Sequence, residues 1–419
     1  MRILIVYFDL VDTVGGAQKV CCNLANSLNE YSCKVDILTD GQKDKNPYFQ
    51  LNSSVSLKNI DEFSHGILSD TVYELLKFSG RVFNKIFRHT IFARLGWWCC
   101  YFGLHRKLSK AITQLDKTEH LDAIICFLPH TFVAVMHAMP GMRERVIFST
   151  HNSPKHDFGD NPKRYDQNRF DIYLRRRLLS SAKAIVILQE EFYDELGLYL
   201  PHPSKNLVTI PNALPNVWHK SPVNFQPRDK IILCVGRKAP QKNHLFLARC
   251  WAKYSNRLPG WKLIFLGPSD DQELTNFIEK QPDNSNIEVH DPMKNVSAWY
   301  DRSYMLAMPS EYEGLPMVLL ESMSRGLPVV AFEETPGVSA LVKKSGTGQL
   351  APRKSGDTEL SFFETMESLC KNPDIWKSCH AMALSSSKKY TNDIVTKQWL
   401  SLIQTPHGEI NSNNHFDVE

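Results

Sequence analysis

The chain has 419 residues, and 49 Lys and Arg stand against 45 Asp and Glu, so its net charge is only +4. Hydrophobic residues make up 42% and charged residues 22% of the chain. These proportions are typical of a globular protein, and they exclude a disordered or collagen-like chain. The length predicts two domains, or three. The small positive excess does not by itself indicate a nucleic-acid-binding protein.

The cysteines and the N-terminus indicate a cytosolic protein. Ten cysteines are scattered along the chain and none has Cys-x-x-Cys spacing, which favours reduced and mostly buried thiols over a zinc site or a redox pair. Residues 1–12 predict a first β-strand and no signal peptide, because Asp9 ends the short apolar run. Residues 123–142 contain no Asp, Glu, Lys or Arg, but Pro129 and Pro140 interrupt them. We therefore predict a buried strand, a turn and a short helix there, and no membrane-spanning helix.

Short apolar runs alternate with longer amphipathic stretches, of which residues 17–28 are the first. Continuous apolar strands between helices predict parallel sheets covered on both faces. The strands form two series, separated by residues 218–228, which contain two prolines and have little periodicity. The predicted strands are Ile3–Phe8, Lys34–Thr39, Asp122–Leu128, Arg145–Ser149, Ala184–Leu188, Leu207–Ile210, Lys230–Val235, Lys262–Leu266, Ile287–His290, Tyr304–Met308 and Pro328–Phe332.

These strands are more than one doubly wound sheet usually contains. The pattern therefore predicts an α/β protein with two Rossmann-like domains facing each other across a cleft. The first domain is predicted over residues 1–220 and the second over residues 221–390. Ligands of such sheets bind beyond the carboxyl ends of the strands. A helix within residues 391–404 is expected to cross back to the first domain, and residues 405–419 are expected to form a flexible tail.

The segment PSEYEGLPMVLLE, residues 309–321, follows a predicted strand and opens a helix. Pro316 suits the first helical turn, and the amides after it can receive a phosphate or a sugar hydroxyl. Glu321 can accept two hydrogen bonds from ribose hydroxyls, and Glu313 can reach a sugar ring. The same spacing also fits a plain strand–turn–helix with exposed glutamates, and the spacing alone does not separate the two interpretations.

A second segment, VGRKAPQKN at residues 235–243, follows the first strand of the second series. Gly236 permits a tight turn, Arg237 offers a planar fork to phosphate oxygens, and Lys242 adds a mobile positive charge. Two cations at the carboxyl end of a strand suit a diphosphate. An ordinary basic loop has the same residues, so the segment does not establish a phosphate site by itself.

Together and in this order, the two segments resemble glycosyltransferase family 4, a family of retaining enzymes with the GT-B fold, in its type that builds bacterial surface polysaccharides and lipid-linked glycans. The resemblance extends to a glycine-rich loop at residues 14–20 and to the segments STHN at 149–152 and IPNA at 210–213. Two positions depart from the family pattern, because Gln18 and Ala340 stand where the family often has Glu. The residues that match the two central motifs are Gly236, Arg237, Lys242, Asn243, Glu313 and Glu321.

The resemblance implies transfer of a sugar from a nucleotide diphosphate sugar, with UDP-sugar favoured, to a lipid-linked or surface glycan acceptor. Arg237 and Lys242 would neutralise the departing diphosphate, Glu313 would orient the donor sugar, and His151 would lie near that sugar. The residues implied to bind the nucleotide sugar are Gly15, Gly16, Asn212, Gly236, Pro292, Gly314, Leu315, Pro316, Met317, Val318 and Glu321. We expect no cofactor and no metal, since no Asp-x-Asp occurs in the chain.

Residues 77–110 contain eight Lys and Arg, no acidic residue and many aromatic residues. A basic amphipathic helix of this kind can lie in an anionic membrane surface, and its cations could also bind a lipid diphosphate. We therefore predict a cytoplasmic protein that is peripheral on the inner face of the cell membrane. The alternative is that the apolar side packs on the first domain and the basic side is solvated. The residues predicted to contact the membrane or lipid acceptor are Lys77, Arg81, Lys85, Arg88, Arg94, Trp97 and Trp98.

Two other functions fit the same architecture. One is a nucleotide-sugar epimerase, which needs acid and base groups that converge on the sugar. The other is a non-catalytic GT-B partner subunit, which would not need the charged residues of the two motifs. The chain contains neither Gly-x-Gly-x-x-Gly nor Gly-x-x-x-x-Gly-Lys-Ser/Thr, which argues against a nicotinamide dehydrogenase and against an ATPase. Nucleic acid is not an expected partner, and the arginines at residues 175–177 are expected at the solvated end of a helix.

Overall fold

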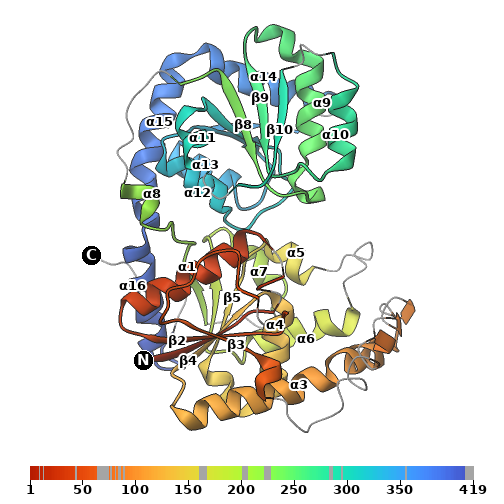
Figure 1. Ribbon diagram of the computed structural model, residues 1–419, viewed down its shortest axis with the longest axis vertical. Coiled ribbons are helices and arrows are strands. Elements are labelled where there is room, and N and C mark those ends of the chain that lie inside the picture. Colours follow the sequence, from red (N-terminus) through yellow and green to blue (C-terminus); the bar gives the residue numbers. More distant parts are fainter. Residues whose placement is uncertain are drawn as a thin grey trace. The chain divides into compact units, whose positions relative to one another are not determined.

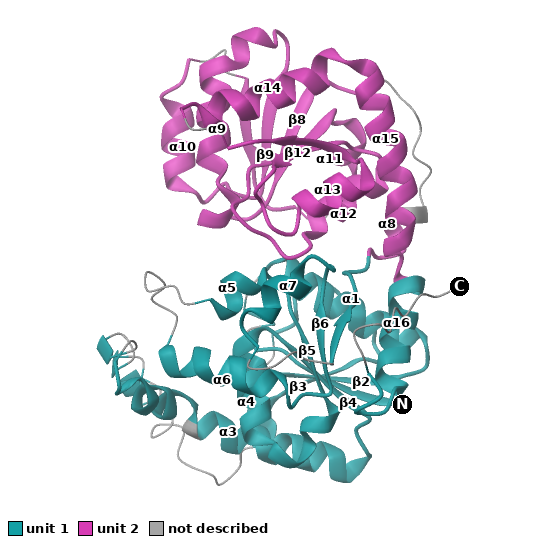
Figure 2. Ribbon diagram, turned by 180° about the vertical axis from the view of Figure 1, so that it is seen from behind, with its two compact units in different colours: residues 1–213, 393–419 teal, residues 214–392 magenta. Residues whose placement is uncertain are grey.

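The structure is a computed structural model that divides into two compact units, residues 1–213 with 393–419 and residues 214–392 (Figure 2). The first segment of the first unit ends at Ala213, a few residues before the predicted boundary at residue 220. Leu214, at the start of the second unit, pairs with Thr391 at its end. The structure describes all residues except 9, 13, 43–44, 64–74, 76–77, 81, 84–85, 88–89, 160–167, 201–205, 221–227, 283–285, 294–295, 354–355 and 411–419.

The first unit contains a seven-stranded sheet in the order β3-β2-β1-β4-β5-β6-β7, and all its neighbouring strands are parallel. This order places β1 inside the sheet and is of the Rossmann type, as predicted. The six predicted strands are present. The edge strand β3 was missed because its sequence, SLKN, has a single strongly apolar residue. The strands are β1 (Arg2–Val6), β2 (Lys34–Thr39), β3 (Ser56–Asn59), β4 (Ala123–Phe127), β5 (Val146–Ser149), β6 (Ala184–Ile187) and β7 (Leu207–Thr209).

Helices cover this sheet because alternate residues of each strand are buried on opposite faces. Leu4 and Val6 of β1 belong to one hydrophobic cluster with residues of α3, α4 and α6, which Figure 1 shows together. The uncharged residues 123–142 form β4 and α4, as predicted. Within the described part of the chain, no helix is long and apolar enough to cross a membrane. The helices of the unit are α1 (Gly16–Glu30), α3 (Ala93–Thr118), α4 (Pro129–Ala138), α5 (Pro154–Phe158), α6 (Arg169–Leu179), α7 (Phe192–Gly197) and α16 (Asn392–Gln404).

The helix α16 lies at the end of the sequence but belongs to the first unit from Asp393 onward, as its colour in Figure 2 shows. Lys183, just before β6, is buried, and its Nζ donates a hydrogen bond to the backbone oxygen of Ile403, 2.7 Å away. That oxygen lies in the last turn of α16, where carbonyl groups lack partners within the helix and favour a positive charge. The described part of the predicted tail ends at Ile410, which is buried.

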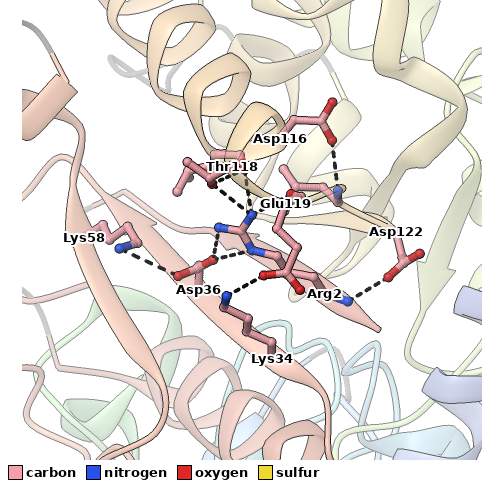
Figure 3. A network of polar contacts seen from close by, with 10 residues as sticks. Arg2, Lys34, Asp36, Lys58, Asp116, Thr118, Glu119 and Asp122 are labelled. Atoms are coloured by element: carbon pink, nitrogen blue, oxygen red, sulfur yellow. Dashed lines mark hydrogen bonds and ion pairs between the residues drawn. The ribbon is translucent and has the colours of Figure 1, made fainter.

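An ion-pair network fastens the amino-terminal edge of the first sheet (Figure 3). Arg2 of β1 and Asp36 of β2 are both buried, and the guanidinium Nη2 lies 2.8 Å from the Asp36 carboxylate. Arg2 Nη1 also donates to the backbone oxygens of Leu115 and Glu119 at the end of α3, at 2.6 Å each. One side chain therefore joins two strands and the carboxyl end of a helix.

We predict that Arg2→Met lowers the free energy of unfolding by about 3 kcal/mol, because the Asp36 carboxylate would remain buried without its main partner. Lys34→Met is the matched control. Lys34 pairs with Glu119 in the same region, but both side chains are about half exposed, so this loss should stay below about 1 kcal/mol. Urea unfolding of the two variants measures the difference, and equal losses would contradict the interpretation.

The second unit contains a six-stranded parallel sheet in the order β10-β9-β8-β11-β12-β13. Its five predicted strands are present, and the edge strand β13 was missed. The strands are β8 (Ile231–Val235), β9 (Lys262–Leu266), β10 (Ile287–His290), β11 (Met305–Met308), β12 (Val329–Phe332) and β13 (Gly348–Ala351). The helices are α8 (Val217–Lys220), α9 (His244–Tyr254), α10 (Gln272–Glu279), α11 (Ser297–Arg302), α12 (Met317–Ser324), α13 (Ser339–Ser345), α14 (Thr358–Lys371) and α15 (Pro373–Ser387).

The core of the second unit lies between its central strands and the helices α9 and α14. Ile232 and Phe265 point into it from β8 and β9, and Trp251 and Phe363 cover them from α9 and α14. The cysteines of the chain are all free, and most of them are buried, as predicted.

Candidate functional site

The two predicted motifs of the second unit meet at one edge of its sheet. They follow β8 and β11, which are adjacent parallel strands, so both motifs leave the sheet at its carboxyl edge. The backbone N–H of Glu311 donates to the backbone oxygen of Gln241 at 2.8 Å. Asn243 Nδ2 donates to Glu311 Oε1 at 2.7 Å. The sequence showed two separate motifs, and the structure joins them by hydrogen bonds.

Lys242 and Glu313 form an ion pair at the centre of this junction. Lys242 Nζ lies 2.7 Å from Glu313 Oε1, and the side chains are 18% and 8% exposed. Gln241 Nε2 lies 3.3 Å from the other carboxylate oxygen, Glu313 Oε2. The cation predicted to bind phosphate and the carboxylate predicted to bind sugar therefore neutralise each other in this structure.

Gly337 supports the loop that carries Glu313. The backbone N–H of Glu313 donates to the oxygen of Pro336 at 3.0 Å. Gly337 has a φ of +78°, and a Cβ atom there would lie only 2.0 Å from the Gly314 oxygen and 2.3 Å from the Glu313 oxygen. Only glycine allows this close approach of the two backbones.

Gly337→Ala should lower the free energy of unfolding by about 2–5 kcal/mol, since the left-handed backbone strain adds to a collision with the Glu313 loop. Gly260→Ala is the control, because Gly260 has the same φ of +78° and open space around a Cβ atom. This control should lose only about 1–2 kcal/mol. Chemical unfolding measures both values. A smaller loss for Gly337→Ala than for Gly260→Ala would refute the role of the close contact.

Pro316 is the N-cap residue of α12 and lies just before the first helical turn, in which the sequence placed it. Its φ of −71° and ψ of 131° are extended, and Met317 begins the helix. The first amides of a helix have no partner within it and carry the positive end of its dipole. Gly314 and Leu315 are buried, whereas Val318 is partly exposed. The segment from Glu313 to Val318 thus brings a carboxylate and helix amides to one edge of the sheet.

Glu321 is buried in α12, with 3% exposure. Tyr300 of α11 donates its hydroxyl hydrogen to Glu321 Oε2 at 3.0 Å. Burial, and secondarily the Glu321 charge, raise the pKa of Tyr300 well above its usual value, so this hydroxyl stays protonated as a donor. Sequence reasoning missed Tyr300, because nothing in the WYDR segment of α11 shows which helix its hydroxyl would meet.

Other predicted residues of the second unit lie at the same carboxyl edge. Arg237 follows β8 and is exposed, with Nη1 3.4 Å from the backbone oxygen of Lys238. Pro292 follows β10 and is also exposed. Arg353 is a further residue that the sequence did not reveal. Its guanidinium pairs with Glu311 at 3.0 Å and lies over the Phe332 ring, so it braces the loop next to Glu313.

In the first unit, the predicted residues also follow strands of the sheet. Gly15 and Gly16 begin α1, and His151 and Asn212 follow β5 and β7. Gly15 has an extended φ of −175°, and a Cβ atom on Gly16 would meet nothing within 4 Å. The backbone therefore does not require glycine at these two positions, and Gly16 leaves open space at the N-terminus of α1. Asn212 is buried and lines a cavity of about 20 Å³.

His151 stacks on Phe127, with ring centroids 4.6 Å apart and an interplanar angle of 11°. Its Nε2 atom is buried, and among the described residues it has no hydrogen-bond partner. Burial lowers the pKa of His151 to about 3, so the ring is neutral at physiological pH. A neutral imidazole can offer a hydrogen bond to a sugar but no positive charge. That His151 lies near the donor sugar stays a prediction.

The structure contradicts part of the role predicted for the basic aromatic segment, residues 77–110. Trp97 is 1% exposed, and its Nε1–H donates to Asp171 Oδ1 at 3.0 Å. Its assignment to the membrane surface was therefore wrong, because the core of the first unit covers the ring and Asp171 satisfies its polar atom. Arg94 and Trp98 are exposed. The predicted membrane residues Lys77, Arg81, Lys85 and Arg88 lie outside the described residues.

The expectation for the arginines of α6 also needs correction. Arg177 is exposed, as expected, but Arg175 is buried. Arg175 forms an ion pair with Asp171 at 2.7 Å, and its Nη1 donates to the backbone oxygen of Asp157 at 2.9 Å. It therefore connects α6 with α5, where the three consecutive arginines had suggested only solvated charge.

Known proteins share both halves of this architecture. A family model described as "Glycosyltransferase Family 4" matches residues 14–215, and one described as "Glycosyl transferases group 1" matches residues 229–372. The amylovoran biosynthesis glycosyltransferase AmsD of Erwinia amylovora is 23% identical over 412 residues, which cover 96% of this chain and 99% of AmsD.

One further relative and one solved structure have informative names. A Campylobacter jejuni protein is named as the alpha-1,4-N-acetyl-D-galactosaminyltransferase of a GalNAc-GalNAc-diNAcBac-PP-undecaprenol, and it is 23% identical over 93% of this chain and 95% of its own length. The solved structure of S. aureus TarM with Fondaparinux, alpha-GlcNAc-glycerol and UDP has a TM-score of 0.70 at 15% identity. That match covers 96% of this chain and all of the TarM chain.

The two model matches follow one another and cover most of the chain. The chain therefore belongs to glycosyltransferase family 4, and it is an enzyme of the hexosyltransferase class with the GT-B fold. The predicted family, fold class and enzyme class are confirmed. Of the functions that the sequence left open, the comparisons favour the glycosyltransferase over the epimerase and the non-catalytic subunit.

Proposed function

We propose that the protein transfers a sugar from a nucleotide diphosphate sugar, with UDP as the favoured nucleotide, to a lipid-linked or surface glycan acceptor. The anomeric configuration is retained and no metal takes part. The observation that carries this proposal is the Lys242–Glu313 pair at the shared carboxyl edge of β8 and β11. The Campylobacter relative, named for an undecaprenol diphosphate acceptor, and the TarM structure, which contains UDP, support the choice of acceptor and donor.

The reaction breaks the bond between the anomeric carbon and a diphosphate oxygen, and the electron pair leaves with that oxygen. The bond to the acceptor hydroxyl oxygen forms, and the hydroxyl proton passes to an oxygen of the departing diphosphate. Negative charge therefore grows on the diphosphate, and placed positive charge stabilises it most effectively. Lys242 and Arg237 supply that charge at the end of β8, and the amides of Met317 and Val318 add the positive end of α12.

Donor binding in this proposal exchanges one ion pair for another. The diphosphate attracts Lys242 Nζ away from Glu313, because its charge exceeds that of the carboxylate. Glu313 Oε1 is then released to accept hydrogen bonds from hydroxyls of the donor sugar. Glu321 receives the ribose, and the Tyr300 hydroxyl, which donates to Glu321 Oε2, fixes the direction of that carboxylate.

We predict that Lys242→Met lowers turnover at saturating donor by about 100-fold or more, because a placed charge at the leaving group is lost. Lys262→Met is the control, since Lys262 also pairs with a glutamate in the second unit, Glu288 at 2.8 Å, but it lies at the amino end of β9 and is about half exposed. The assay follows nucleoside diphosphate release from a panel of nucleotide sugars, with and without a lipid-linked acceptor. Equal activity of the two variants would remove Lys242 from the site.

The same assay tests the proposed function as a whole. Release that requires the acceptor and persists in a chelator supports a metal-independent transferase. Isomerisation of the sugar without acceptor would instead indicate an epimerase, and binding without turnover would indicate a non-catalytic subunit. The anomeric configuration of the product distinguishes retention from inversion.

We also propose that the enzyme works at the inner face of the cell membrane and meets it through its basic aromatic segment. Gly80 is buried there, and a Cβ atom on it would lie 2.7 Å from the backbone nitrogen of Cys100, so this helical residue packs directly on α3. Phe83 and Phe87, on the same side, are partly buried. The exposed apolar residues of the segment are Phe78, Val82, Ile86, Ile91, Phe92, Leu95 and Trp98.

An anionic bilayer suits this surface because residues 77–110 contain no acidic side chain. The double variant Phe78→Ser with Ile86→Ser should bind anionic vesicles at least about tenfold more weakly, since two exposed apolar side chains are lost. Leu198→Ser is the control, because Leu198 is 79% exposed but lies outside the segment. Vesicle sedimentation at low salt measures binding, and a wild-type protein that stays in the supernatant would refute the membrane proposal.

A further inference from the structure

His244 is the first residue of α9 and directly follows the Lys242–Asn243 pair of the predicted phosphate motif. Its side chain is only 3% exposed. Both ring nitrogens are buried without a hydrogen-bond partner in the part of the chain that the structure describes. A buried polar group without a partner costs about 1–3 kcal/mol, so native proteins rarely keep one without a functional reason.

The ring of His244 adjoins the space that Gly236 leaves open. A Cβ atom on Gly236 would lie 3.3 Å from His244 Nε2 and 3.5 Å from Cγ and Cδ of Lys242. The imidazole and the lysine stem therefore border the same point at the carboxyl end of β8. The stem of Lys242 borders this point while its Nζ is bound to Glu313.

Burial, and secondarily the charge of Lys242, lower the pKa of His244 to about 4. The imidazole is therefore neutral at physiological pH, with one N–H donor and one acceptor nitrogen. A neutral ring does not repel the neighbouring ammonium group. Its N–H can still donate to an anion, and the N-terminus of α9 favours an anion at the same position.

We propose that His244 binds the donor diphosphate, by donating the Nε2 hydrogen to a phosphate oxygen that lies beside Gly236. This inference rests on the proposed function, because it assumes a nucleotide diphosphate sugar as donor. The movement of Lys242 from Glu313 to the diphosphate draws its stem away from the imidazole. The phosphate then reaches Nε2 and satisfies the buried donor, so the lysine and the histidine bind the same leaving group.

The test compares nucleotides that share a base and differ in phosphate number. Isothermal titration first finds which of UDP, GDP, ADP and TDP binds the wild-type chain, and then uses the monophosphate and the nucleoside of that base. His244→Phe should weaken the diphosphate about tenfold, the effect of one lost hydrogen bond to a charged group, and leave the nucleoside unchanged. His244→Gln, whose Nε2 can replace the imidazole donor, should restore most of the affinity.

His380→Phe is the matched control. His380 is a second histidine of this unit, and its Nδ1 lies 2.6 Å from the backbone oxygen of Gly326, within hydrogen-bond distance. Its replacement can lower stability but should leave diphosphate affinity intact. Unchanged diphosphate affinity in His244→Phe, or an equal loss for diphosphate and nucleoside, overturns the inference. If His244→Phe does not fold, His244→Leu and His244→Gln are compared instead. The deciding quantity is again the loss of affinity for the diphosphate relative to the loss for the nucleoside. A wild-type chain that binds none of the diphosphates overturns the proposed function itself.

Discussion

The structure of the candidate site depends on the need to neutralise a carboxylate that is almost completely covered by protein. Glu313 has little contact with water, so its charge requires a partner, and Lys242 supplies it. This pairing holds the loop after β11 against the loop after β8. The donor of the proposed reaction would compete for the same ammonium group, so the charge that stabilises Glu313 is also the charge that attracts the substrate.

The parallel sheet makes this arrangement possible. Strands that run in one direction place all their following loops at one edge, and Rossmann strand order makes β8 and β11 neighbours although their loops are distant in sequence. Gly337 adds the steric condition, because its missing side chain lets two loop backbones touch. Charge pairing, strand order and one glycine together explain why the two motifs meet.

Much of this could be predicted from the sequence, because apolar strand cores and motif residues are local signals. The strands β3 and β13 could not, since their sequences, SLKN and GQLA, contain few strongly apolar residues. Trp97 was misplaced because an aromatic residue fits a core and a membrane surface equally well until its neighbours are known. Arg175 was misjudged because its i,i+4 spacing from Asp171 does not show that the pair is buried, with Asp171 against Trp97. Tyr300 and Arg353 contribute through partners far away in sequence.

The discontinuity of the first unit has a consequence for the order in which the protein is made. A ribosome releases the seven strands of the first sheet long before it releases α16, because all of residues 214–392 come in between. Until then the buried ammonium group of Lys183 has no carbonyl of Ile403 to receive its hydrogen bond. The second unit is continuous in sequence and can complete its fold first. Translation therefore supplies α16 to the first unit only after the whole of the second unit.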